Sequence, residues 1–355
     1  MKETSKLKIL ILARRFRSNQ SEADEHDFVY NKKILERFNN PPHSNLIKYD
    51  LFSNYKEYLN WEPSFVFFLG FNPQALEIKK KFKNSKFGIW AKCYSSSIND
   101  EFKNFFEELD IIFDSCFFNI LSKKKNYFYL PTAIHKNFKY KIIKNIYLSL
   151  YRKKLINQVK KFDIIFSGSP RFNRQDNYRQ ELINILLKKG IKILICSPKR
   201  LWFQSKFKVD TNYQSNLSFS AHNYWATKDM YKNAKFVLDL PWLDTIIPEL
   251  ESKFDPQFAL GWNIFRSGFH GSNLITYDCE MNRNIGLNSQ NCSFYKSNVE
   301  KLSNLADEIE YIIKNTNKNK IEYNKANLKK NFNTKHSYDE RWKFIITELN
   351  KINNY

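Results

Sequence analysis

Short apolar runs alternate with stretches of helical periodicity, and this alternation constrains the fold more than any other feature of the sequence. The first run, residues 8–13, has the length and apolar content of a buried parallel strand. Residues 22–38 then place their apolar side chains at near-helical spacing. Further strands are predicted over residues 46–51, 65–69, 87–91, 111–113 and 127–130. Strands that alternate with helices predict an α/β fold with parallel sheets.

The alternation starts a second time after residues 136–161, a segment with helical spacing and no predicted strand. A strand over 163–166 is followed by a helix over 177–189, which we expect to end at Gly190. Later strands are predicted over residues 191–196, 235–240 and 274–277. The junction is expected inside the strand-free segment. The two expected α/β domains are residues 1–145 and 160–335.

Two segments match the capping box, in which a serine and a glutamate three residues later satisfy the first free amides of a helix. They are Ser297–Glu300 and Ser337–Glu340. The second segment opens the last predicted helix, residues 338–350. The apolar stripe of this helix consists of Trp342, Ile345, Ile346 and Leu349. Such a stripe needs an apolar partner, so we expect the helix to dock on the body of the protein.

Basic residues exceed acidic residues along the whole chain. The 355 residues include 58 lysines and arginines and 36 acidic residues, which gives a formal net charge of +22. Such an excess favours nucleic acid, an anionic membrane surface or a phosphorylated substrate as a partner. A general bias towards lysine explains the balance equally well, because the lysines are spread along the sequence rather than gathered in one arm.

The sequence gives no signal for a zinc finger, a disulfide framework or a membrane-spanning helix. Its five cysteines are scattered and never have CxxC spacing, so we expect reduced thiols. No run approaches the roughly 18 apolar residues that indicate a membrane-spanning helix. We therefore expect a soluble cytoplasmic protein without a secretion signal.

The segment that follows the strand at 163–166 has the composition of an anion-binding turn. It links a strand to a helix, where free backbone N–H groups can face a phosphate and arginines can neutralise a diphosphate. Its candidate phosphate-binding residues are Ser167, Gly168, Ser169, Arg171, Arg174 and Arg179. Taken by itself, the segment is better explained as an ordinary strand-to-helix turn with solvated arginines.

Several motifs follow this segment along the chain, and their order and spacing matter as much as their residues. They are Met230–Asp239, in which a helix precedes a strand ending in Leu-Asp, then Arg266–Gly271, Leu274–Asp278 and His336–Arg341. Together they resemble the second domain of GT-B glycosyltransferases, and their pattern is similar to the spore-maturation-protein-like branch of glycosyltransferase family 1. The resemblance spans residues 160–350; before residue 140 it rests on the strand-helix alternation and on Leu130-Pro131.

The resemblance implies two Rossmann-like domains that face each other across a cleft, with a nucleotide-sugar donor on the second. It also implies that a C-terminal helix, residues 336–355, crosses back to the first domain. The donor phosphates would lie against Ser167, Gly168 and Ser169. Arg179 and Arg266 would balance the phosphate charge without a metal ion or any other cofactor.

The other donor-site candidates lie in the matched motifs: His270, Gly271, Asp278 and Glu280. The family usually has a carboxylate shortly after the Arg266 position to hold the ribose, and this chain has none there. Asp278 or Glu280 would then take over that contact. The same two residues resemble a metal-binding Asp-x-Asp pair, but in the wrong half of the chain for the single-domain glycosyltransferase fold that uses one. No metal site is predicted.

A general base for the acceptor hydroxyl is needed if the reaction inverts the sugar. The candidates are Asp24, Glu25 and His26, in the acidic segment after the first strand, and Asp100. The acidic segment is more simply explained as a solvated helix start, because acidic side chains favour the first turn of a helix.

The leading hypothesis is a hexosyltransferase-like enzyme that moves a sugar from a nucleotide-sugar to a hydroxyl acceptor, in cell-envelope polysaccharide or glycolipid synthesis. It would be cytoplasmic or peripheral at the inner membrane face. One alternative is a phage-type glycosyltransferase that acts on modified DNA bases. The other is a non-catalytic, basic nucleic-acid-binding protein, although no helix-turn-helix, RNA-recognition or zinc motif supports it.

Overall fold

The computed structural model divides the chain into two compact units. Unit 1 comprises residues 1–135, 242–260 and 337–355, and unit 2 comprises residues 136–241 and 261–336. The structure describes residues 7–13, 22–40, 45–70, 72–91, 105–114, 126–131, 133, 146–168, 178–197, 208–209, 211–219, 224–240, 262–297 and 301–353.

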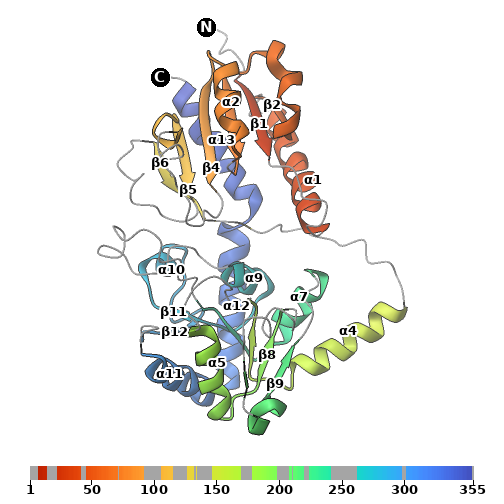
Figure 1. The fold of residues 1–355 in the computed structure, drawn as a ribbon, viewed down its shortest axis with the longest axis vertical. Helices are drawn as coiled ribbons and strands as arrows, with labels where there is room; N and C mark the ends of the chain where they lie inside the picture. The colour runs from red at the N-terminus through yellow and green to blue at the C-terminus, as the bar shows by residue number, and fades with distance from the viewer. Residues whose placement is uncertain are drawn as a thin grey trace. The chain divides into compact units, whose positions relative to one another are not determined.

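The sheet of unit 1 has six parallel strands in the order β2-β1-β3-β4-β5-β6 (Figure 1). The strands are β1 (Lys8–Ala13), β2 (Leu46–Leu51), β3 (Phe65–Leu69), β4 (Lys86–Ala91), β5 (Ile111–Asp114) and β6 (Tyr127–Tyr129). Its described helical elements include α1 (Glu22–Glu36), η1 (Arg37–Asn39), η2 (Phe52–Trp61) and α2 (Gln74–Lys81). The strands predicted before residue 131 are all present, so the α/β fold expected for this part of the chain is confirmed.

Side chains alternate across the unit 1 sheet and fill a separate core on each face. Strand β1 contributes Ile9 and Ile11 to one core, where they pack with α1 and with the last helix, α13 (Tyr338–Asn353). It contributes Leu10 and Leu12 to the other core, where they pack with η2 and α2. A strand buried on both faces explains why the sequence of β1 is continuously apolar.

Helix α13 buries its apolar stripe in unit 1. The four residues of the stripe belong to the same core as β1 and α1. Trp342 donates its indole N–H to Asn31 Oδ1 at 2.8 Å, and the Arg341 Nε donates to the Pro131 carbonyl at 2.9 Å. The Ser337 Oγ accepts the Glu340 backbone N–H at 3.3 Å, so the predicted cap at Ser337 is present.

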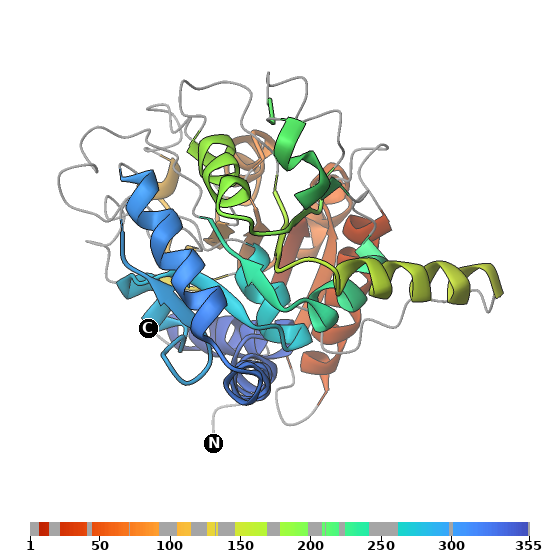
Figure 2. The ribbon, with the colours of Figure 1, turned by 90° about the horizontal axis from the view of Figure 1, so that it is seen from below.

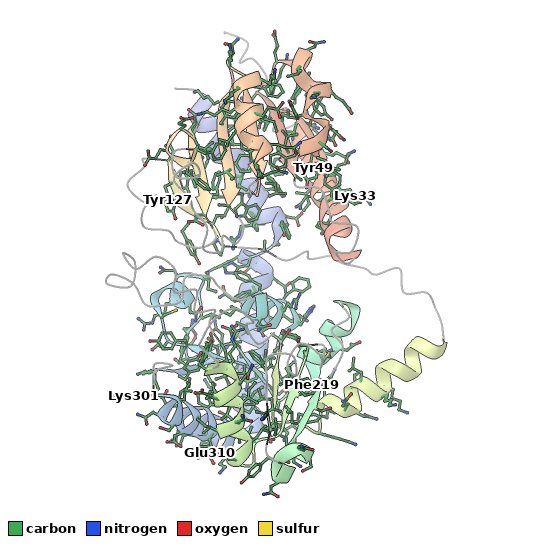
Figure 3. The ribbon with its side chains drawn as sticks, viewed as in Figure 1. Lys33, Tyr49, Tyr127, Phe219, Lys301 and Glu310 are labelled. Carbon is green, nitrogen blue, oxygen red and sulfur yellow. The ribbon has the colours of Figure 1, made fainter. Side chains whose placement is uncertain are left out.

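The sheet of unit 2 also has six parallel strands, in the order β12-β11-β10-β7-β8-β9. The strands are β7 (Ile164–Phe166), β8 (Ile193–Ile195), β9 (Leu217–Phe219), β10 (Phe236–Leu238), β11 (Leu274–Tyr277) and β12 (Ser293–Tyr295). The edge strands β9 and β12 were not predicted. Each has only three residues, and Phe219 of β9, labelled in Figure 3, is only partly buried.

Helices cover both faces of the unit 2 sheet (Figures 1 and 2). On one face, α5 (Tyr178–Lys188) and α11 (Leu302–Asn315) pack against the strands. The other described helical elements of unit 2 are α4 (Ile146–Val159), η3 (Thr211–Asn216), α7 (Tyr224–Asn233), α9 (Trp262–His270), α10 (Glu280–Asn284) and α12 (Lys318–Lys335). Helix α5 is followed by Gly190 in the left-handed conformation (φ +80°), as the sequence predicted for a C′ glycine.

The capping box predicted at Ser297–Glu300 is wrong. Helix α11 begins later, at Leu302, and Lys301 stands at its N-cap without a side-chain cap. The Ser297 hydroxyl instead donates to Glu308 Oε1 at 2.7 Å, and the backbone N–H groups of Lys296 and Ser297 donate to the other oxygen of Glu308. The carboxylate of Glu308, from the middle of α11, therefore accepts the Ser297 N–H group that Glu300 would accept in a capping box.

Candidate functional site

The carboxyl ends of the unit 2 strands converge on a group of buried polar residues. In open parallel α/β sheets, ligands bind at this edge. Ser167 follows β7, Ser197 follows β8 and Asp239 follows β10, and each is less than one-tenth exposed. Buried polar groups usually need hydrogen-bond partners, and the partners here include residues of helix α9 for Ser167 and of strand β11 for Asp239.

The turn after β7 is tightly packed against the strand that precedes it. A Cβ atom on Gly168 would lie 2.8 Å from Cζ of Phe166, so glycine lets the backbone lie directly over this ring. The Ser167 carbonyl accepts the Asn263 Nδ2 amide of α9 at 2.7 Å. The next predicted residue, Ser169, lies outside the described residues, as do Arg171 and Arg174.

Arg266 approaches the turn from α9. Its positive charge acts on the hydroxyl of Tyr231 on α7 and on the thiol of Cys196 after β8, and it lowers the pKa of both groups. Burial raises the pKa of Cys196 to about 12 against the influence of this charge. The positive charge of Arg266 is therefore held close to the ends of β7 and β8.

Arg179 approaches from α5, on the other face of the sheet. Its Nη2 donates to the Leu240 carbonyl at 2.9 Å, and its Nε donates to the Tyr178 hydroxyl at 3.3 Å. The guanidinium carbon lies 5.7 Å from the centroid of the Phe166 ring. Hydrogen bonds and cation–π contacts thus fix Arg179 beside the turn after β7.

Asp239 is a buried site residue that the sequence analysis did not select. It is 5% exposed, and its Oδ2 accepts the Thr276 hydroxyl at 3.1 Å. Its Oδ1 is buried and has no hydrogen-bond partner among the described residues. Burial raises the pKa of Asp239 to about 6, while the Thr276 hydrogen bond and the Arg179 charge act in the opposite direction. The available sequence signal was a strand that ends in aspartate at a ligand-binding edge.

The remaining donor-site candidates have local partners in unit 2. His270 lies beside Phe269, with ring centroids 5.3 Å apart. Gly271 (φ +71°) ends α9, and a Cβ there would lie 3.3 Å from the Lys325 carbonyl of α12. Asp278 forms an ion pair with Arg283 at 2.8 Å, so its carboxylate is already engaged. Glu280 begins α10, but its side chain lies outside the described residues.

The candidate general bases are not placed by the structure. Asp24, Glu25 and His26 lie in the first half of α1, which has the helix start expected for this acidic segment. Their side chains, and the whole of Asp100, lie outside the described residues. Within the described ranges, no group of three or more His, Cys, Asp or Glu residues could hold a metal ion. No described helix is long and apolar enough to cross a membrane.

Comparison with known proteins gave structural matches only: no protein-family model and no curated protein sequence matches this chain. A glycosyltransferase from Rickettsia africae is 13% identical, with a TM-score of 0.62 over 98% of this chain and 99% of that one. Sucrose-phosphate synthase from Thermosynechococcus elongatus is 9% identical, with a TM-score of 0.59 over 97% and 98%.

Anabaena HepE in complex with UDP is 10% identical, with a TM-score of 0.58 over 97% of this chain and 100% of that one. Two six-stranded parallel sheets with helices, matched over nearly the full length of these structures, give this chain the GT-B fold. The fold predicted from the motif resemblance is therefore confirmed.

Proposed function

We propose that this protein is a nucleotide-sugar-dependent glycosyltransferase, of the hexosyltransferase type, that transfers a sugar to a hydroxyl acceptor. One observation carries the proposal: the turn after β7 is flanked by Arg179 from one face of the unit 2 sheet and by Arg266 from the other. Two fixed cations beside a glycine-containing turn suit a diphosphate, which carries negative charge on both phosphates.

The position of Arg179 is compatible with an anionic ligand. It lies in the first turn of the described α5, where the helix dipole is positive, so a bound anion would be attracted by both the dipole and the guanidinium. A nucleoside diphosphate supplies that anion, and its charge grows as the bond to the sugar breaks. The two arginines would then stabilise the leaving group more strongly in the transition state than in the bound donor.

A uridine nucleotide is the first donor class to test, because HepE, which shares the fold, binds UDP. The motifs Met230–Asp239, Arg266–Gly271 and His336–Arg341 support a place in the spore-maturation-protein-like branch of glycosyltransferase family 1. The net charge of +22 supports an acceptor at an anionic surface, such as a glycolipid or envelope polysaccharide precursor at the inner face of the membrane.

The proposal is tested by a thermal-shift screen of UDP-, GDP-, ADP- and dTDP-sugars. A ligand at about 100 times its dissociation constant adds about 2.7 kcal/mol to stability. The donor that stabilises the protein is then tested for slow release of its nucleoside diphosphate in water, and for transfer to glycolipid and to duplex DNA acceptors. Absence of stabilisation by every nucleotide sugar would contradict the proposal, and transfer to DNA alone would contradict the envelope acceptor.

A further inference from the structure

Tyr231 places a hydroxyl group at the centre of the polar contacts beneath the turn after β7. The residue lies on α7 and is 1% exposed. A buried tyrosine hydroxyl usually finds a hydrogen-bond partner, and Tyr231 donates to Asn263 Oδ1 at 2.7 Å. The amide of Asn263 in turn donates to the Ser167 carbonyl at 2.7 Å. These two bonds connect α7, α9 and the turn after β7.

The same hydroxyl also interacts with the two residues that flank the candidate phosphate site, Ser167 and Arg266. Burial raises the pKa of the Tyr231 hydroxyl to about 12, while the positive charge of Arg266 and polar interaction with the Ser167 and Arg266 side chains lower it. Asn263 and Arg266 are three residues apart on α9, so they lie on the same side of that helix. One buried hydroxyl is therefore linked through Asn263 to the turn after β7, and it lies within the electrostatic influence of Arg266.

We propose that Tyr231 and Asn263 are positioning residues that hold Arg266 and the turn after β7 in the geometry needed to bind a diphosphate. This inference rests on the proposed function, because it assigns these residues to the same donor site. A free arginine side chain loses rotamer freedom when it binds a ligand. Tyr231 restricts Arg266 before the ligand arrives, and this reduces the entropic cost of binding.

The inference is tested with Tyr231→Phe, which keeps the ring and removes only the oxygen. Affinities for UDP and for uridine are measured by calorimetry for the wild type and the variant. We expect the variant to bind UDP about tenfold more weakly, in the range for one hydrogen bond to a charged group, and uridine unchanged. A general loosening of unit 2 would weaken the binding of both ligands. Equal losses of affinity for UDP and for uridine would therefore overturn the inference.

A double-mutant cycle identifies the residue through which Tyr231 acts. In an Arg266→Ala background, Tyr231→Phe should change UDP affinity less than twofold, because the group that it positions is absent. A further tenfold loss in that background would show that Tyr231 acts independently of Arg266. The matched control is Tyr55→Phe in unit 1, which removes the hydroxyl of another buried tyrosine, one that donates to Glu77 at 2.5 Å. This control should leave UDP affinity unchanged.

Asn263→Ala provides a second variant if Tyr231→Phe does not fold. Asn263 is partly exposed, and its replacement removes the link between Tyr231 and Ser167. The variant should also bind UDP more weakly while its affinity for uridine stays unchanged. A wild-type protein that binds no nucleotide would overturn the proposed function itself. A wild type that binds UDP, together with folded variants that bind it equally well, would overturn only the positioning role.

Discussion

Asp239 shows at the scale of a single residue how the candidate site differs from an ordinary protein core. A buried carboxyl destabilises the fold when it is ionised, and one oxygen of Asp239 has no hydrogen-bond partner in the described part of the chain. Its pKa is about 6 in the folded protein and near 4 in an unfolded chain. Between these two values the unfolded state releases its proton first, so stability falls as the pH rises from about 4 to 6 and then stays low.

We therefore predict that Asp239→Asn is more stable than the wild type at pH 7.5. The amide keeps an oxygen for the Thr276 hydroxyl and removes the cost of ionising the buried carboxyl, about 3 kcal/mol for a pKa raised by about two units. The melting temperature should rise by a few degrees at pH 7.5 and match that of the wild type at pH 4. A lower melting temperature at pH 7.5 would show that attraction between the carboxylate and Arg179 outweighs its burial.

The two arginines at the candidate site also bear on whether the transfer reaction needs a divalent metal ion. Arg179 and Arg266 supply positive charge at the turn after β7, so transfer should need no divalent cation. The rate of release of nucleoside diphosphate should be the same in excess EDTA and in Mg²⁺ or Mn²⁺. Loss of activity in EDTA with recovery on addition of Mn²⁺ would contradict this prediction and favour Asp278 and Glu280 as ligands.

At the scale of elements, the crossing of α9 and α12 supports the position of Arg266. Gly268 lies at this crossing, where a Cβ atom would be 2.2 Å from the ring of Phe332. Neither helix was predicted. Helix α9 is short and contains glycine in its interior, and α12 is rich in lysine and asparagine with only Asn324, Leu328 and Phe332 buried. The sequence signal for both is weak because tertiary contacts stabilise them more than local propensity does.

We predict that Gly268→Ala lowers the free energy of unfolding by about 1–3 kcal/mol, the usual cost of overpacking. Thermal unfolding followed by circular dichroism measures the loss. Phe332→Leu removes the ring that an alanine at position 268 would crowd. The double variant Gly268→Ala/Phe332→Leu should therefore lose less free energy of unfolding than the sum of the losses of the two single variants. If the two losses add exactly, crowding against Phe332 is not the cause of the destabilisation by Gly268→Ala.

The strands were more predictable than the site. A continuous apolar run such as β1 indicates a buried parallel strand from local sequence alone. The partners of Tyr231, Asn263 and Asp239 depend on which helix lies over which strand end, and no local pattern contains that information. The motif resemblance drew attention to Ser167, Gly168, Arg179 and Arg266, and the structure shows how each of these four is held.

At the scale of the whole molecule, the last helix completes unit 1. Helix α13 comes after all the strands of unit 2 in the sequence, yet its apolar stripe lies in the core that contains β1 and α1. Trp342 is fully buried there and lies edge-on to the rings of Phe67 and Trp90. Unit 1 therefore cannot form its full core until residues 338–353 have been synthesised.

We predict that Trp342→Ala lowers the free energy of unfolding by about 3–5 kcal/mol, as expected for a large cavity. Lys343→Ala, at an exposed neighbouring position on α13, is the matched control and should have little effect. Removal of residues 337–355 should reduce both the melting temperature and transfer. A truncated protein with unchanged melting temperature would contradict a structural role for α13, and a membrane-contacting role for its stripe would then be favoured.

The central claim is that unit 2 binds a nucleoside diphosphate through the turn after β7 and its two arginines. Calorimetric titration of UDP into the wild type, Arg266→Ala and Arg179→Ala tests it most directly, with Arg37→Ala as the control. Arg37 is a 65% exposed arginine of unit 1 that pairs with Asp339 on the surface. We predict that each site variant stays folded and loses about 1.5–3 kcal/mol of binding free energy, roughly 10- to 100-fold in affinity, while the control binds as the wild type does. Folded site variants that bind UDP as tightly as the wild type would contradict the claim.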